Sequence, residues 1–117
     1  MDLITSGLLQ VQQVIVNLLR NAIEAVNESP THTKKVRLST RVDQQFVEFE
    51  VADSGPGLNS DHPERIFEPF YTTKPDGLGL GLPISRTIIE AHGGRLWSVT
   101  PCEQGATFRF TLPLWSA

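Results

Sequence analysis

The chain has 117 residues, of which 39% are hydrophobic, so it suits a single domain with one hydrophobic core. Its formal net charge of −3 gives no electrostatic argument for binding nucleic acid. No apolar run is long enough to cross a bilayer, and the first six residues lack the pattern of a signal peptide. A single cysteine, Cys102, excludes an internal disulfide. Together these features favour a reducing, cytoplasmic environment.

A first helix is predicted over about residues 9–27, where apolar residues recur at spacings of three and four. Such spacing places them on one face of a helix, the face that packs against a core. A second stripe along the same helix is polar. The apolar positions are Val11, Val14, Ile15, Leu18, Leu19, Ala22 and Val26, and the polar positions are Gln13, Asn17, Arg20, Asn21 and Glu24.

Two strands are predicted next, over residues 36–42 and 46–51, because apolar and polar residues alternate in both. The link at residues 43–45 is short enough for a hairpin between them. The second strand leads directly into the glycine-rich turn Asp53-Ser54-Gly55-Pro56-Gly57. These strands are therefore expected to pair antiparallel and to end at that turn.

Residues 58–81 form the longest stretch without clear periodicity, with a brief helix expected around residues 63–67. Long irregular segments in compact domains are often functional lids. This one ends in Gly77-Leu78-Gly79-Leu80-Gly81. We expect Phe67 and Phe70 to anchor the lid on the sheet.

A second helix is predicted from near Leu82, because the proline that follows suits a first helical turn. The sequence His92-Gly93-Gly94 forms its C-terminal stop signal. Residues 95–100 and 106–112 are expected to close the sheet as a hairpin. The side of the helix expected to be buried carries Ile84, Ile88 and Ala91.

The predicted order is helix, two strands, lid, helix, two strands, which does not alternate as a doubly wound parallel sheet would. The fold class expected is α+β. Its architecture would be a two-layer sandwich with helices on one face of a mixed, mostly antiparallel sheet. The whole chain, residues 1–117, is expected to be one domain.

Most familiar nucleotide and metal motifs are absent from the sequence. There is no G-x-x-x-x-G-K-[ST] phosphate loop, no G-x-G-x-x-G after a strand, and no H-R-D or D-F-G element of the eukaryotic-type kinases. No cysteine and histidine cluster has zinc spacing. The remaining signal is four segments in a fixed order: residues 17–22 (NLLRNA), 53–57 (DSGPG), 66–74 (IFEPFYTTK) and 77–82 (GLGLGL).

These four segments resemble, in order, the N, first glycine, F and second glycine boxes of the histidine kinase ATPase domain. That domain has a Bergerat-type fold and belongs to the superfamily shared with DNA gyrase, MutL and heat-shock chaperone ATPases. The resemblance covers nearly the whole chain and includes a final Gly105-Ala106-Thr107-Phe108. The sequences of residues 72–75 and 84–94 most resemble those of the nitrogen-regulatory and FixL-like subgroup. The resemblance also implies that residues 3–5 are a remnant of the family's first strand.

The resemblance implies that the first helix carries the metal and phosphate groups. Asn21 would be the Mg²⁺ ligand, and a single carboxamide oxygen suits that hard cation. Asn17 stands where hydrolytic relatives have a glutamate that activates water. An amide cannot take a proton at neutral pH, which argues against efficient ATP hydrolysis. Arg20 would either approach a phosphate or pair with Glu24 four residues later.

The glycine boxes would hold the two ends of the nucleotide. Asp53 would accept a hydrogen bond from the adenine amino group, and Gly55 and Gly57 would allow the base to approach closely. The glycines of residues 77–81 would turn backbone N–H groups towards phosphate oxygens, at the positive end of the second helix. The complete set expected to bind nucleotide is Asn17, Arg20, Asn21, Ala25, Asp53, Gly55, Gly57, Leu58, Thr72, Thr73, Lys74, Gly77, Leu78, Gly79, Leu80, Gly81 and Thr107. The residues expected to be catalytic are Asn17 and Lys74.

None of the three histidines, His32, His62 and His92, has the setting of the family's phosphoacceptor. The resemblance therefore implies a monomeric catalytic domain from a longer sensor kinase. It would bind Mg²⁺ and ATP and donate the γ-phosphoryl group to a histidine on a separate dimerisation and phosphoacceptor domain. A response regulator would be an indirect partner, with no contact to nucleic acid or membrane. The alternatives are an anti-sigma-type protein serine kinase, a non-catalytic nucleotide-binding or docking module, and a gyrase-like ATPase, which would need a carboxylate at Asn17.

Overall fold

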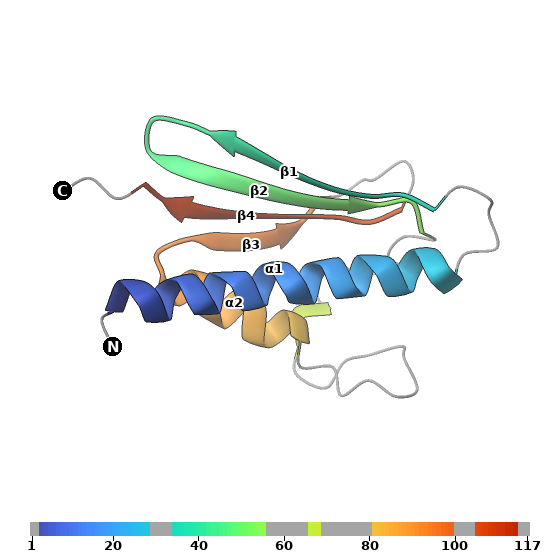
Figure 1. The fold of residues 1–117 in the computed structure, drawn as a ribbon, viewed down its shortest axis with the longest axis horizontal. Helices are drawn as coiled ribbons and strands as arrows, with labels where there is room; N and C mark the ends of the chain where they lie inside the picture. The colour runs from blue at the N-terminus through green and yellow to red at the C-terminus, as the bar shows by residue number, and fades with distance from the viewer. Residues whose placement is uncertain (1–2, 29–33, 56–65, 69–80, 100–104, 115–117) are drawn as a thin grey trace.

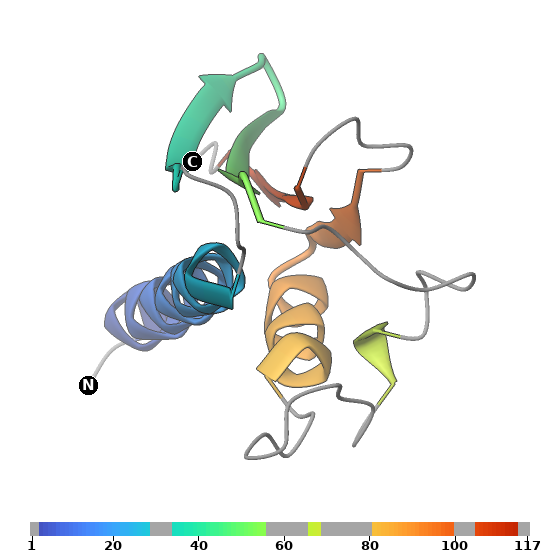
Figure 2. The same cartoon turned by 90° about the vertical axis from the view of Figure 1, so that its right-hand side faces the viewer.

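The structure is a computed structural model that describes residues 3–28, 34–55, 66–68, 81–99 and 105–114. Two helices cover one face of a four-stranded sheet, as the two views in Figures 1 and 2 show. The two-layer α+β sandwich predicted from the sequence is therefore confirmed. The elements are α1 (Leu3–Glu28), β1 (Val36–Val42), β2 (Phe46–Asp53), α2 (Gly81–Ala91), β3 (Arg95–Ser98) and β4 (Thr107–Pro113).

The strand order in the sheet is β1-β2-β4-β3, so the last strand of the chain lies in the interior of the sheet. All three neighbouring pairs are antiparallel. A mixed sheet was expected, but no parallel pair occurs among the described strands. The β1–β2 pair and the β3–β4 pair lie side by side, joined by antiparallel pairing of β2 with β4.

Most predicted element bounds agree with the structure to within two residues. The largest difference is at the start of the chain, where Leu3, Ile4 and Thr5 belong to α1 and not to a remnant strand. The strand β2 extends to Asp53, which places this carboxylate inside the ladder opposite Val36 of β1.

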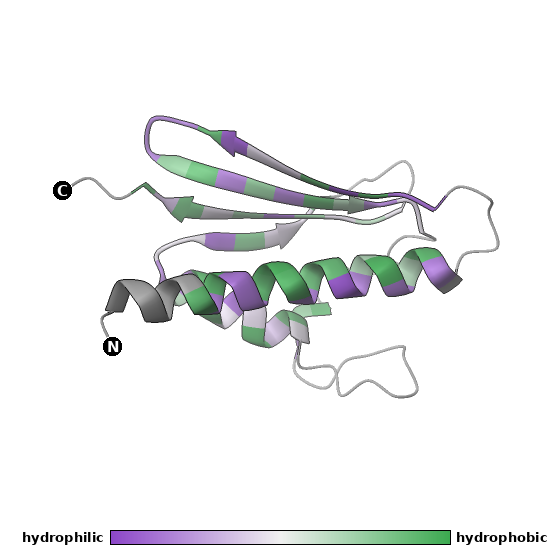
Figure 3. Cartoon of the chain, in the orientation of Figure 1, coloured by the Kyte–Doolittle hydropathy of each residue, from purple (hydrophilic) through white to green (hydrophobic). Residues whose placement is uncertain are grey.

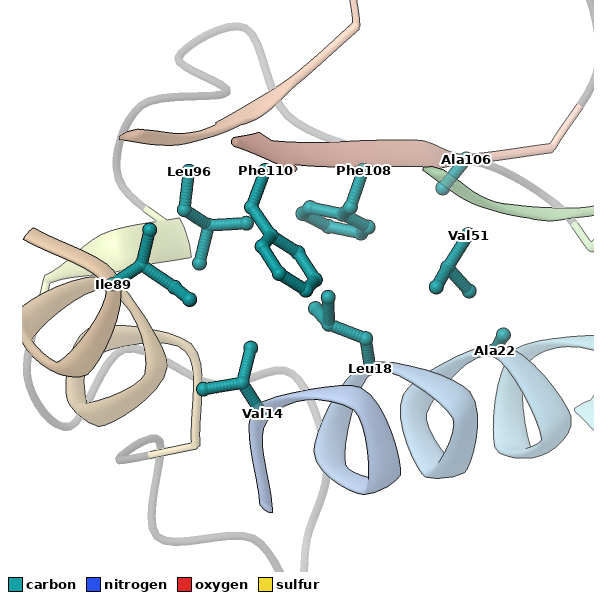
Figure 4. Packing of buried hydrophobic residues seen from close by; sticks show 9 residues of the cluster. All are labelled: Val14, Leu18, Ala22, Val51, Ile89, Leu96, Ala106, Phe108 and Phe110. Carbon is teal, nitrogen blue, oxygen red and sulfur yellow. The ribbon is translucent and has the colours of Figure 1, made fainter. Parts of the chain in front are cut away.

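The core lies between α1, α2 and the helix-facing side of the sheet. Figure 4 shows Val14 and Leu18 of α1 pointing towards Phe110 of β4, beside Ile89 of α2. Phe110 is 0% exposed, and its ring stacks on Phe49 of the neighbouring strand with 4.8 Å between ring centroids. The apolar stripe predicted for the first helix is therefore the face that packs on the sheet.

The buried face of α2 differs from the prediction. Ser85 and Ile89 are buried, whereas Ile84 is 49% exposed and Ala91 is also exposed. Residues four apart lie on one side of a helix, and Ile84 is rotated by about 100° from Ser85. Ile88 is partly buried and packs against the core, as expected. The buried side was predicted from the positions of apolar residues, so the buried Ser85 was not included.

The face of the sheet away from the helices carries charged pairs, and Figure 3 shows hydrophilic and hydrophobic residues alternating along the strands. Arg41 pairs with Glu48 at 3.5 Å, and Arg109 pairs with Glu50 at 2.7 Å. The hydrogen bond that Arg109 donates to Glu50 raises the pKa of Arg109 above its ordinary value. Neither described helix is both long and apolar enough to cross a membrane.

Within residues 58–81, the segment predicted to be a lid, the structure describes Ile66, Phe67, Glu68 and Gly81, and Phe70 lies outside the described residues. The Phe67 ring packs edge-on against Phe108 of β4, with 6.4 Å between ring centroids. The guanidinium of Arg86 in α2 lies 4.9 Å from the centre of the same ring. The expected anchoring of the lid on the sheet is therefore confirmed for Phe67.

Replacing Phe110 with alanine removes the largest fully buried side chain of the core. We expect Phe110→Ala to lower the free energy of unfolding by about 3–5 kcal/mol, measured by urea denaturation. Val42→Ala is the control, because Val42 is 70% exposed at the edge of the sheet. Its expected effect is within about 0.5 kcal/mol. Equal effects of the two substitutions would contradict this account of the core.

Candidate functional site

Asp53 is held at the end of β2 with only 9% of its surface exposed. Its Oδ1 accepts hydrogen bonds from the backbone N–H of Gly55 at 2.9 Å and of Ala106 at 3.3 Å. Among the described residues, no hydrogen bond reaches its other oxygen, Oδ2. The carboxylate is therefore fixed through one oxygen and can accept a hydrogen bond from a ligand through the other.

Gly105 allows the backbone just before β4 to approach the end of β2 closely. Its φ is +73°, and a Cβ atom placed there would lie 1.7 Å from the backbone oxygen of Asp53. Only glycine fits this conformation and this space. The contact brings the N–H of Ala106 to the Asp53 carboxylate.

The turn after β2 lies directly on the backbone of α1. A Cβ atom on Gly55 would lie 3.0 Å from the carbonyl carbon, the carbonyl oxygen and the Cβ of Ala25. Ala25 thus meets Gly55, and the contact places the end of β2 against the C-terminal half of α1.

A second contact joins α1 to the start of α2. The Nδ2 atom of Asn17 donates a hydrogen bond to Oγ of Ser85 at 3.0 Å. A Cβ atom on Gly81 would lie only 2.8 Å from Oδ1 of Asn17. Asn17 therefore lies beside the N-terminus of α2, where unpaired backbone N–H groups attract anions.

Asn21 lies between these two contacts. It is four residues after Asn17 and four before Ala25, so the three residues follow one side of α1 over about 12 Å. Arg20 and Glu24 instead line a hollow on the surface of α1, together with Val16, Leu19 and Ile23. Neither of the two roles proposed for Arg20, a phosphate contact or a pair with Glu24, is decided by this position.

The structure brings together one part of the predicted set and does not describe the rest. Thr107 stands opposite Ala52 in the ladder, next to Asp53 and Ala106. The predicted residues that lie outside the described part of the chain are Gly57, Leu58, Thr72, Thr73, Lys74, Gly77, Leu78, Gly79 and Leu80.

Two contributors to this site were not predicted from the sequence. Ser85 is a polar residue on a buried helix face, and its four-residue spacing from Gly81 is the one signal that could have identified it. The backbone N–H of Ala106 carries no side-chain signal. Its position depends on the conformation of Gly105, which the sequence alone does not give.

Comparison with known proteins identifies the family. Residues 7–116 match the histidine kinase-, DNA gyrase B- and HSP90-like ATPases, and the chain belongs to this family. The chain is 48% identical over 112 residues to the sensor protein FixL of Bradyrhizobium diazoefficiens. That match covers 96% of this chain and 22% of FixL, so the chain spans about a fifth of that relative.

Solved structures of histidine kinases have the same fold. The nucleotide-free catalytic domain of the histidine kinase ThkA superposes with a TM-score of 0.75 at 40% identity, covering 89% of this chain and 66% of that one. Full-length ShkA in complex with AMPPNP gives a TM-score of 0.77 at 36% identity, covering 92% of this chain and 22% of that one. The predicted family and fold are thereby confirmed.

Replacing Gly105 with alanine tests the close approach at Asp53. Gly93→Ala is the matched control, because Gly93 also has a positive φ, of 82°, but its new Cβ would approach only Pro113 at 3.4 Å. The backbone conformation alone costs each alanine about 1–3 kcal/mol. We expect Gly105→Ala to be clearly more destabilising in thermal unfolding, because it adds a clash with a backbone oxygen. Equal losses would show that the hairpin moves freely away from β2.

Proposed function

We propose that this chain binds Mg²⁺ and ATP and donates the γ-phosphoryl group to a histidine on a separate dimerisation and phosphoacceptor domain. One observation carries the proposal: α1 is contacted at Ala25 by Gly55, which follows Asp53 at the end of β2, and at Asn17 by the N-terminus of α2. An adenine-type acceptor and an anion site thus lie at the two ends of one polar stripe. An elongated, anionic nucleotide fits that arrangement.

Asp53 is the proposed adenine-binding residue. Its fixed carboxylate presents Oδ2, an acceptor suited to the exocyclic amino group of adenine. The backbone of Gly55 and the side chain of Thr107 are the proposed neighbours of the base, because both adjoin Asp53 in the structure. Gly57 and Leu58, which follow in the sequence, are proposed to complete the adenine end.

The phosphates are proposed to lie at the N-terminus of α2, at Gly81. Backbone N–H groups there are suited to phosphate oxygens, and the helix dipole adds positive potential. Residues 77–80 and the side chains of Thr72, Thr73 and Lys74 precede this helix in the sequence and are proposed to bind the same charge.

Asn21 is the proposed metal ligand. Mg²⁺ takes few protein ligands, and the remainder come from phosphates and water. A carboxamide between the adenine end and the phosphate end of α1 suits such a site. When bound, ATP supplies the γ-phosphoryl group, and the protein contributes position and charge neutralisation.

The polar residue at Asn17 favours transfer over hydrolysis. Its amide donates to Ser85 and cannot act as a general base towards water. ATP would therefore stay intact until a better nucleophile, the acceptor histidine, reaches it. The response regulator is proposed as the subsequent acceptor of that phosphoryl group.

Two substitutions should separate the adenine end from the metal site in calorimetric titrations. Asp53→Asn keeps an oxygen for the N–H groups of Gly55 and Ala106 but replaces Oδ2 with a donor. It should weaken ADP binding about 10- to 100-fold with or without Mg²⁺, the equivalent of losing a charge-assisted hydrogen bond. Asn21→Asp should chiefly alter the Mg²⁺ dependence of binding. Wild-type behaviour of both variants would refute this site.

The transfer reaction is tested by mixing the chain with radiolabelled ATP and a histidine-bearing helical domain of a related sensor kinase. We expect acid-labile label on the added domain, little label on the chain itself, and very slow release of free phosphate. Nucleotide binding without any transfer would favour the docking-module alternative. Rapid phosphate release without the acceptor would favour a gyrase-like ATPase.

A further inference from the structure

Ser85 is an unusual residue for its position. It is 3% exposed on a face of α2 that otherwise carries Leu82 and Ile89, which pack in or against the core. Burial of a hydroxyl is costly unless it is hydrogen-bonded. Here Oγ accepts the Nδ2 hydrogen of Asn17 at 3.0 Å, so the serine is buried facing the polar stripe of α1.

The Asn17 amide is confined between two residues of α2. Its Nδ2 is bound by Ser85, while its Oδ1 is so close to Gly81 that an added Cβ would lie 2.8 Å away. Gly81 and Ser85 are four residues apart and so lie on one side of the helix. In the structure the amide nitrogen is bonded to Ser85, and the amide oxygen is the atom nearest to an added Cβ on Gly81, with the nitrogen next at 3.0 Å.

This orientation decides what the amide can bind. An amide nitrogen donates hydrogen bonds and could bind phosphate oxygens directly, whereas an amide oxygen only accepts them. With one N–H of Nδ2 engaged by Ser85, Oδ1 is the acceptor that lies nearest to Gly81. The complementary ligand is a donor, and a water molecule bound to Mg²⁺ is a strong one because the cation polarises it.

We propose that Ser85 is a positioning residue that orients the Asn17 amide, so that Oδ1 accepts a hydrogen bond from a water molecule of the Mg²⁺–nucleotide complex. The inference rests on the proposed function, because it needs a metal–nucleotide complex at this end of α1. Ser85 acts only through Asn17 and does not touch the nucleotide. Its contribution therefore depends on both the metal and Asn17.

The test compares calorimetric affinities for AMPPNP with Mg²⁺ and for ADP without metal. Ser85→Ala should weaken the first about three- to tenfold, the range expected for one hydrogen bond, and leave the second unchanged. Ser85→Cys fills a similar volume with a weak acceptor and should behave like Ser85→Ala, even if the alanine variant proves unstable. Ser85→Thr keeps the hydroxyl and should stay close to wild type.

Two further variants distinguish positioning from general packing. Thr87→Ala removes a hydroxyl from the exposed side of the same helix, where Oγ1 bonds to Pro83, and should change neither affinity. In an Asn17→Ala background, Ser85→Ala should have no additional effect on the Mg²⁺-dependent affinity, because the residues act as one unit.

The inference is overturned if Ser85→Ala weakens metal-free ADP and Mg²⁺–AMPPNP equally, or if its effect persists without the Asn17 side chain. In either case wild-type nucleotide binding still supports the proposed function. If the folded wild-type chain binds neither nucleotide, the proposed function fails, and the role of Ser85 fails with it.

Discussion

Close backbone approach to α1 is the constraint on which the site depends. Gly55 meets Ala25 and Gly81 meets Asn17 at separations that leave no room for a Cβ atom without movement of a neighbour. Each contact brings one loop-bearing element onto the same helix. The separation of the end of β2 from the N-terminus of α2 therefore follows the rise of α1 between Ala25 and Asn17.

The core fixes the rotation of that helix. Val14, Leu18 and Ala22 are buried against the sheet, and a rotation of α1 that withdrew Asn17 from α2 would also pull these side chains out of the core. Packed interiors tolerate such displacement poorly. Hydrophobic packing on one face of α1 thus determines the direction in which Asn17 and Asn21 project from the adjacent face.

Much of this arrangement could be predicted from the sequence, wherever a regular spacing of apolar residues or a family motif indicated it. The apolar and polar stripes of α1 and the alternation in β1 and β2 gave elements that agree with the structure. The resemblance in residues 17–22 and 53–57 agreed with the family found by comparison. The predicted functions of the individual site residues remain predictions.

The rest depends on tertiary contacts that have no local pattern. The face of α2 was misjudged because Ile84 and Ala91 are apolar, whereas the buried position belongs to Ser85, whose hydroxyl has a partner 68 positions earlier in the chain. The hydrogen bond from Ala106 to Asp53 spans 53 positions and requires the positive φ of Gly105. Neither contact can be found from the spacing of residues within one segment.

The position of β4 has a consequence for how the molecule is assembled. This strand joins the β1–β2 hairpin to β3 and contributes Phe108 and Phe110 to the core, yet it follows the other described elements in the sequence. A two-stranded hairpin alone is marginal in water, and pairings between distant segments form slowly because a long loop must close first. During synthesis the helices and the first hairpin therefore precede the strand that joins them, and their apolar faces stay uncovered until β4 pairs. Pairing of β4 thus completes the sheet and the core together, and a chain without this strand would leave the β1–β2 hairpin and β3 unjoined.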